Sequence, residues 1–236
     1  NDPPRRYFGK FDATPASDDG VQTDPRRKKI QAYANMAMGL HLIEHARLLG
    51  LKKFVQVGTI CAYPKFTPVP FKEDDLWDGY PEETNAPYGI AKKALLVMLQ
   101  AYRQQYNLNG IYLLPVNLYG PGDNFDLQSS HVLPALMAKA HTAKTDGAPS
   151  MEVWGSGNAK REFLFADDLA DALVHLMKVY SDDIQINVGT GKDIAIREVA
   201  EMVCQVVGFA GDLDFDSSMP DGAPRKLLNV DRLTDM

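Results

Sequence analysis

A tyrosine and a lysine stand four residues apart near the middle of the chain, at Tyr88 and Lys92. At this spacing both side chains project from one face of a helix. Because an ammonium beside a phenol favours the phenolate, we expect Lys92 to lower the pKa of Tyr88 from its reference value of ~10. The hydroxyl of Thr59, just after a strand-like run, can then share a substrate carbonyl oxygen with Tyr88. This arrangement would deliver a proton in ketone reduction or accept one in alcohol oxidation.

The same Tyr-x-x-x-Lys spacing also occurs by chance in many helices, where it joins one core residue and one solvated residue. Its meaning depends on the elements around it. Helical periodicity is found at residues 30–49, 88–108, 131–144, 167–177 and 196–207, and short apolar strands at 53–59, 111–117, 151–154, 184–188 and 213–215. This alternation predicts an α/β fold with a parallel sheet. Residues 64–87 carry five prolines and predict a long loop, which suits a compact domain if it lines a site.

The composition narrows the class of protein. The chain has 236 residues, 45% of them hydrophobic and 24% charged, which is typical of a globular protein of one large or two small domains. A formal net charge of -6 argues against general binding to nucleic acid or a membrane surface, so an anionic ligand must meet local basic groups. We find no membrane-spanning run, no signal-peptide core and no disulfide framework, and therefore expect a cytoplasmic protein.

One expected element is missing. A dinucleotide-binding fold normally opens with a strand, a glycine-rich turn and a helix. The early glycines Gly9, Gly20 and Gly39 do not follow an apolar strand, and no Gly-x-Gly-x-x-Gly occurs before Thr59. The sequence therefore reads as a chain that lacks the first strands of such a sheet.

The segments around these residues resemble a known family. Residues 58–64 and 83–92 are similar to the extended short-chain dehydrogenase/reductases, also called the NAD-dependent epimerase/dehydratase family. Segments 117–132, 153–164 and 220–228 favour its GDP-L-fucose synthase subfamily, and the resemblance spans roughly residues 32–233. It implies a Rossmann-like doubly wound parallel sheet, apparently without its first strands, and a smaller C-terminal substrate-binding part.

The resemblance also implies a division of the chain. Residues 1–28 would be an irregular N-terminal segment, and 29–130 the remainder of the dinucleotide-binding domain. Residues 131–236 would be mainly the substrate domain, with about 160–190 returning to the first domain.

Roles in the reduction follow from the same resemblance. Tyr88 would protonate the C4 oxygen of a sugar ketone as hydride arrives, and Lys92 would lower the Tyr88 pKa and bind the nicotinamide ribose. Thr59 stands where the family usually has serine and keeps the hydroxyl. Asn35 would support the proton relay.

Cys61 and His131 would be the base and acid of an epimerisation. The protons at C3 and C5 of the sugar are acidified by the neighbouring ketone, so a thiolate and an imidazole on opposite faces could invert these centres. Cysteine suits this role if nearby positive charge lowers its pKa from ~8.5. A small buried Cys61, and a His131 satisfied at a helix N-terminus, are the structural alternatives.

The ligand-binding positions are implied in the same way. The two lysines among them could also be plain surface residues, and ordinary strand-end packing is the alternative for the apolar positions. Lysine at position 139 replaces the more usual arginine and so loses bidentate pairing. We expect no metal site. NADP(H) would contact Val57, Gly58, Thr59, Ile60, Lys92, Pro115, Val116, Asn117, Leu118 and His131, and the GDP-sugar would contact Lys139, Trp154, Arg161, Asp221 and Lys226.

The implied function is an NADP-dependent oxidoreductase and epimerase that converts GDP-4-keto-6-deoxymannose to GDP-L-fucose, as a homodimer paired through helices 30–49 and 88–108. Two alternatives stay open. Thr59-Ile60 in place of the usual Ser-Ser leaves room for another GDP- or NDP-sugar epimerase without net reduction. The missing glycine turn, which would hold the cofactor pyrophosphate, leaves room for a catalytically silent binding module. The choice between NADPH and NADH also stays open, because the discriminating residue after the second strand of such a fold is missing as well.

Overall fold

The computed structural model describes residues 25–127, 129–219 and 221–236. Residues 1–24 of the predicted irregular segment lie outside the described residues. The end of that segment is predicted wrongly, because helix α1 (Pro25–Leu48) already begins at Pro25. A proline at the first helical position keeps a favourable backbone angle and has no N–H to leave unpaired.

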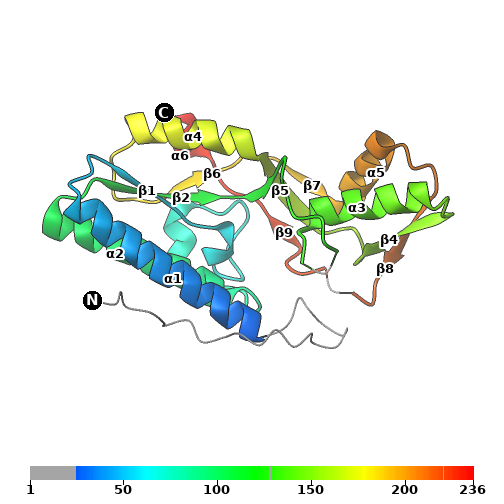
Figure 1. Cartoon of the computed structure of the whole chain (residues 1–236), viewed down its shortest axis with the longest axis horizontal. Coiled ribbons are helices and arrows are strands. Elements are labelled where there is room, and N and C mark those ends of the chain that lie inside the picture. Colours follow the sequence, from blue (N-terminus) through cyan, green and yellow to red (C-terminus); the bar gives the residue numbers. More distant parts are fainter. Residues whose placement is uncertain (1–24, 128, 220) are drawn as a thin grey trace, which may run out of the picture.

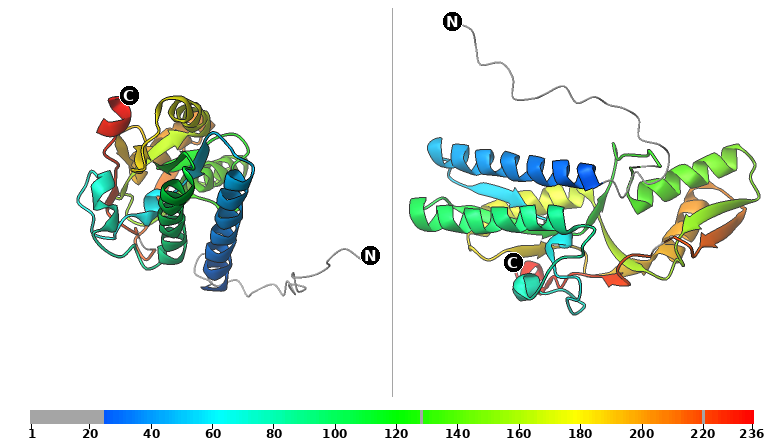
Figure 2. Two further views of the ribbon diagram at one scale, coloured as in Figure 1. Left: turned by 90° about the vertical axis from the view of Figure 1, so that its left-hand side faces the viewer. Right: turned by 90° about the horizontal axis from the view of Figure 1, so that it is seen from below.

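The first part of the chain is built on three parallel strands in the order β1 (Phe54–Val57), β2 (Gly110–Pro115) and β6 (Ile186–Val188). β2 and β6 are buried along their whole length, as expected for strands covered on both faces. Helices α1 and α2 (Ala86–Tyr106) run side by side below the sheet and α4 (Ala166–Val179) lies above it (Figures 1 and 2). This arrangement confirms the predicted α/β class with parallel strands.

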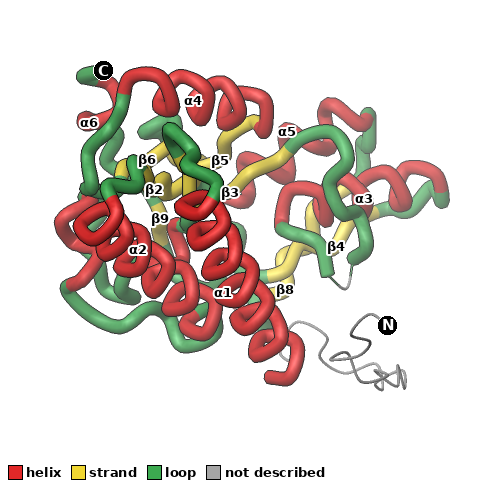
Figure 3. Tube along the Cα trace, turned by 60° about the vertical axis from the view of Figure 1, so that its left-hand side comes forward, coloured by secondary structure: helices red, strands yellow, loops and turns green. Residues whose placement is uncertain are grey.

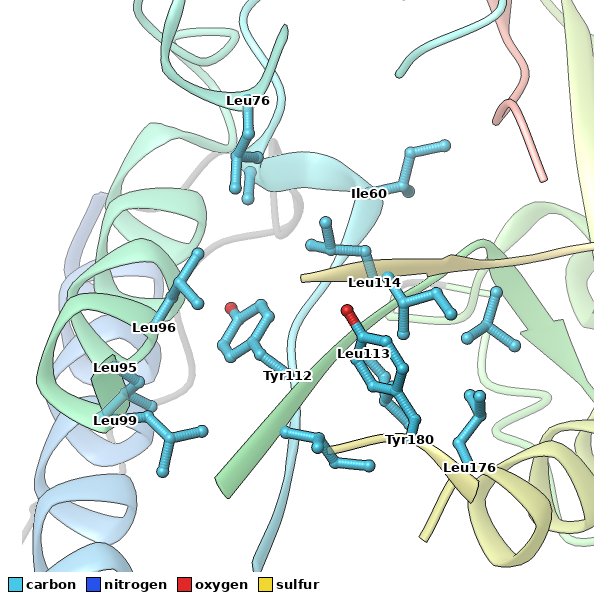
Figure 4. Close-up of a cluster of buried hydrophobic side chains, with 14 of the residues drawn as sticks. Ile60, Leu76, Leu95, Leu96, Leu99, Tyr112, Leu113, Leu114, Leu176 and Tyr180 are labelled. Atoms are coloured by element: carbon cyan, nitrogen blue, oxygen red, sulfur yellow. The ribbon is translucent and has the colours of Figure 1, made fainter. Parts of the chain in front are cut away.

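A large apolar core fills the space between these layers. Leucines of α2 meet Tyr112 and Leu113 of β2, and Leu176 of α4 closes the other face (Figure 4). The Tyr112 hydroxyl, which would be costly to bury unpaired, donates to the backbone oxygen of Lys92 at 2.8 Å. Packing against β2 therefore fixes the turn of α2 that carries Lys92.

The second part has its own core. Strands β4 (Ser150–Trp154) and β8 (Asp212–Asp216) pair in parallel, and helices α3 (Val132–Thr145) and α5 (Ile196–Val207) pack on them. The sequence predicted α5 with these same bounds. Gly208, which caps the C-terminal end of α5, has a left-handed φ of 76°.

A further sheet lies between the two parts (Figures 1 and 3). Strand β5 (Lys160–Phe165) pairs in parallel with β3 (Asn117–Tyr119) and β9 (Arg225–Lys226), and antiparallel with β7 (Asp193–Ala195). Two 3-10 helices, η1 (Ile60–Ala62) and η2 (Glu73–Trp77), and helix α6 (Asp231–Thr234) complete the fold. Within the described ranges, no helix is both long and apolar enough to cross a membrane.

One predicted strand is divided in two. The apolar run 111–117 ends its first pairing at Pro115, and Asn117 starts β3 in the other sheet. The Asn117 side chain donates to the backbone oxygen of Glu162 at 2.9 Å, which draws the chain away from β2 and onto β5. Strand β5 itself was not predicted, because its first residues are charged and only alternate positions are buried.

A buried carboxylate joins these parts. Glu162 of β5 is 0% exposed, and its Oε1 accepts hydrogen bonds from the backbone N–H groups of Thr190 (2.6 Å) and Gly191 (2.7 Å). Its Oε2 accepts from the N–H of Leu228 at 2.9 Å. A charge in an apolar interior is tolerated when it is fully hydrogen-bonded, as here.

We therefore expect Glu162→Leu, which leaves these three N–H groups unpaired, to lower the free energy of unfolding by about 3 kcal/mol or more. Glu162→Gln keeps the shape but turns an amide donor toward at least one N–H, and should cost about 1–3 kcal/mol. Urea denaturation measures both. The exposed Glu201 of α5 provides the control, since Glu201→Gln should change stability by less than about 0.5 kcal/mol. Equal stability of all three variants would contradict the stabilising role of the Glu162 hydrogen bonds.

Candidate active site

Three reactive side chains meet where β1 ends. Thr59 follows β1 and caps η1, and its Oγ1 accepts from the backbone N–H of Cys61 at 3.2 Å. A Cβ on Gly89 would lie 2.5 Å from the Cys61 backbone oxygen, so the glycine allows the first turn of α2 to touch η1. This contact brings Tyr88 to Thr59, with which it shares a side-chain hydrogen bond, and within electrostatic range of Cys61.

The structure corrects the predicted pKa of Tyr88. Burial raises this pKa above its ordinary value, the charge of Cys61 adds to the rise, and the Thr59 hydrogen bond opposes it. Lys92 has another partner, because its Nζ donates to the Val57 backbone oxygen at 2.9 Å and lies 5.7 Å from the Tyr88 ring centroid. Burial lowers the pKa of Lys92. The phenol is therefore held as a neutral proton donor rather than as a phenolate.

The predicted cofactor positions follow two neighbouring strands. Val57, Gly58 and Ile60 lie at the carboxyl end of β1, and the predicted segment 115–118 lies at that of β2. In open α/β sheets, ligands bind outside the carboxyl ends of the strands. A Cβ at Gly58 would lie 2.4 Å from the Tyr112 ring, so the backbone is pressed against the core here. The predicted strand-end positions are thus gathered at one edge of the sheet, whereas His131, also predicted to contact the cofactor, lies just before α3 in the second part of the chain.

Asn35 lies farther back, on α1. It is half-buried and one helical turn before Gly39, where a Cβ would lie 2.3 Å from Leu95 of α2. Asn35 thus lies on the side of α1 that faces α2.

A cavity of about 300 Å³ opens in the second part of the chain. Its lining includes five of the predicted residues, from α3 and its N-cap, β4, β5 and the segment after β8: His131, Lys139, Trp154, Arg161 and Asp221. Lys139 Nζ lies 4.5 Å from the Trp154 ring centroid and donates to the Glu152 backbone oxygen at 3.2 Å. The cavity therefore combines cations, an aromatic face and a carboxylate.

The charged groups of this cavity are held in place by neighbours. Arg161 Nη2 donates to the Asp221 backbone oxygen at 3.0 Å. Burial lowers the pKa of Arg161, while the negative charges of Glu82, Asp221 and Cys61 act in the opposite direction. The Asp221 carboxylate accepts two hydrogen bonds from Ser156, both at 2.7 Å, which lower the pKa of Asp221. Arg161 thus lines the cavity and also lies within electrostatic range of Cys61.

Lys226 is placed apart from the other predicted substrate residues. It lines a smaller cavity of about 20 Å³ together with Cys61, and forms an ion pair with Glu82 at 3.4 Å. It is nevertheless close to the main cavity, since β9 pairs Lys226 with Arg161.

Several residues of the site were not predicted. Ser156 lies between two glycines with φ of 85° and 77°, a pattern that indicates a turn but not its contact with Asp221. Glu82 and Glu162 gave no signal, because a lone glutamate is usually solvated. Ser130, beside His131, also lines the cavity.

Comparison with known proteins agrees with this arrangement. A sequence model of the NAD dependent epimerase/dehydratase family matches residues 14–189. A GDP-L-fucose synthase of Sinorhizobium fredii is 49% identical over 204 residues, covering 86% of this chain and 65% of that protein. One of Escherichia coli is 44% identical over 210 residues, with 85% and 65% covered. This chain thus spans about 65% of the length of these curated relatives.

Solved structures are similar as well. A GDP-L-fucose synthetase from Naegleria fowleri superposes with a TM-score of 0.83 at 26% identity, covering 93% of this chain and 77% of that one. A GDP-6-OMe-4-keto-L-xylo-heptose reductase from C. jejuni gives 0.82 at 33% identity, with 89% and 72% covered.

The raised pKa of Tyr88 has a measurable consequence. An ultraviolet titration of the protein minus that of Tyr88→Phe should show one phenol that ionises above pH ~10. Because the pKa of the folded state exceeds that of the unfolded state, the neutral phenol stabilises the fold below pH ~10, and this stabilisation is lost as the pH rises through the folded pKa. The wild type should therefore lose more stability than Tyr88→Phe above pH ~10. A phenol that ionises below pH ~9 would instead restore the predicted effect of Lys92.

Proposed function

We propose that this chain, which belongs to the NAD dependent epimerase/dehydratase family, forms most of a GDP-sugar 3,5-epimerase/4-reductase that uses NADP(H) and makes GDP-L-fucose. The convergence of Tyr88, Thr59 and Cys61 beside a basic cavity is the observation that carries this proposal. The similarity to curated GDP-L-fucose synthases supports the substrate, and the similarity to a solved GDP-L-fucose synthetase from Naegleria fowleri bound to NADP supports the cofactor.

The reduction uses the neutral phenol. Tyr88 donates its proton to the C4 oxygen of the sugar, and the Thr59 hydroxyl shares that oxygen. Burial keeps the phenol protonated at neutral pH, so the proton is available as negative charge develops on the oxygen. NADP(H), when bound, supplies the hydride.

Lys92 suits the cofactor position. An ammonium has three donor hydrogens, and the bond to the Val57 backbone oxygen uses one of them. The others are available for hydroxyl groups of a ribose at the sheet edge. Its pKa is lowered by burial alone, so in this account Lys92 positions the cofactor and does not create a phenolate.

The epimerisation uses Cys61 and His131. Cys61 lies beside Tyr88, and His131 lines the larger cavity. A sugar ring between them would present C3 and C5 to a thiolate on one side and to an imidazole on the other. Arg161, which interacts with Cys61, supplies positive charge beside that thiolate.

The larger cavity takes the GDP moiety in this proposal. Lys139 and Arg161 meet the diphosphate charge, and Trp154 covers a ring. Asp221, already oriented by Ser156, accepts a donor from the sugar or the base. Lys226 approaches from the Cys61 side.

The test is an incubation of the full-length protein with GDP-4-keto-6-deoxymannose and NADPH, which should lose absorbance at the nicotinamide band. Tyr88→Phe should slow this loss by about 100-fold or more, because the proton donor is gone.

Deuterium uptake from D₂O at C3 and C5 should continue in Tyr88→Phe and fall in Cys61→Ser. Deuterium uptake by the wild type without NADPH consumption would assign an epimerase without net reduction. If neither occurs but NADPH binds, the protein is a binding module.

We also propose a cytoplasmic homodimer that pairs through α1 and α2. Both helices carry exposed apolar side chains although they already pack on each other: Tyr33 (75% exposed), Met38 (55%) and Leu42 (51%) on α1, and Ile90 (40%) and Val97 (49%) on α2. Two such helix pairs would bury these side chains in a four-helix bundle.

Light scattering should therefore give about twice the 26.1 kDa of the chain. Val97→Glu places a charge in this interface and should yield a monomer. Val206→Glu is the matched control, since Val206 lies on α5 and is 86% exposed, and it should leave the dimer intact. A monomeric wild type would reject the proposed assembly.

A further inference from the structure

Two neighbouring serines precede α3 and have opposite surroundings. Ser129 is exposed, and its Oγ donates to Asp126 at 2.7 Å and accepts from Asn124 Nδ2 at 2.9 Å. Ser130 is only 7% exposed, and its Oγ has no hydrogen-bond partner among the described residues. One hydroxyl thus maintains the loop, while the other is buried without a partner.

The loop holds Ser130 in this position. The backbone N–H groups of Ser129 and Ser130 both donate to the backbone oxygen of Asp126, at 3.0 and 2.8 Å. The Asn124 side chain accepts from the Asp126 N–H at 3.1 Å. These bonds fix the backbone just before His131, the N-cap residue of α3, so only the side chain of Ser130 is left to turn.

Ser130 lines the larger cavity beside His131. A buried hydroxyl without a partner is unfavourable, and such a group in a native structure calls for an explanation. The cavity supplies one, because Ser130 lines it and a turn of the side chain about its Cα–Cβ bond would bring this hydroxyl to a ligand there. His131, the N-cap residue of α3, makes no side-chain cap hydrogen bond and also lines the cavity.

The position of Ser130 indicates which part of a ligand it meets. The cations of the cavity, Lys139 and Arg161, suit the diphosphate. Ser130 is instead uncharged, can donate and accept at once, and adjoins His131, which acts on the sugar ring in the proposed reaction. A sugar hydroxyl has the same two capacities. Because Ser130 and a sugar hydroxyl can each donate and accept, we expect Ser130 to contact the hexose rather than the phosphates.

We propose that the Ser130 hydroxyl hydrogen-bonds a hydroxyl group of the hexose of a GDP-sugar. This inference rests on the proposed function, because it takes the cavity as the GDP-sugar site. Ser130 then orients the ring between Cys61 and His131 and selects GDP-hexoses over GDP itself.

Calorimetric titration of the protein with GDP-mannose and with GDP tests the inference. Ser130→Ala should weaken binding of GDP-mannose by about threefold to tenfold, the effect of one neutral hydrogen bond, and leave GDP binding unchanged. Its melting temperature without ligand should equal or exceed that of the wild type, because an unpaired buried hydroxyl has been removed. Ser129→Ala is the matched control, and should lower the melting temperature but keep the wild-type ratio of the two affinities.

Three results would overturn the inference. Unchanged GDP-mannose binding by Ser130→Ala, with normal binding by the wild type, would reject the contact and leave the proposed function standing. Equal weakening of GDP and GDP-mannose would show that Ser130 does not act on the hexose. A wild type that binds neither ligand would reject the proposed function as well.

Discussion

The geometry of the site depends on the buried carboxylate of Glu162. Its two oxygens receive backbone N–H groups from the loop after β6 and from Leu228, and its backbone oxygen receives the Asn117 side chain. Arg161, the residue before Glu162, lines the larger cavity and lies within electrostatic range of Cys61. A residue with no direct role in catalysis thus ties β5 to the loop after β6, to Leu228 and to Asn117.

A second polar network fixes the long loop after η1. The Asn187 side chain of β6 accepts from the Tyr63 hydroxyl at 2.7 Å and donates to the backbone oxygens of Phe71 and Asn229. The backbone N–H of Asn187 donates to the buried carboxylate of Glu73 at 3.0 Å. Residues 64–87 therefore pack against the sheet, and Pro64 and Glu82 line the small cavity beside Cys61. The loop thus lines the site, which is the condition under which a loop of this length suits a compact domain.

Local patterns predicted the parts of this fold that local chemistry determines. The spacing of Tyr88 and Lys92 placed both on one face of α2, and apolar periodicity located most helices and strands. The direction of the Tyr88 pKa shift was missed, because burial and the Val57 oxygen that engages Lys92 arise only from tertiary packing. Glu162 and the contrast between Ser129 and Ser130 were invisible for the same reason. Each depends on partners or burial that no spacing in the chain reveals.

The central claim is that Tyr88 and Thr59 on one side, and the cavity of Arg161 and Lys139 on the other, bind a single ligand. A crystal structure with NADP⁺ and a GDP-hexose tests it most directly. This account predicts the hexose C4 oxygen within hydrogen-bond reach of the Tyr88 and Thr59 hydroxyls, about 2.6–3.2 Å, and the diphosphate beside Arg161 and Lys139. A hexose bound away from Tyr88, or a nucleotide outside the cavity, would contradict it.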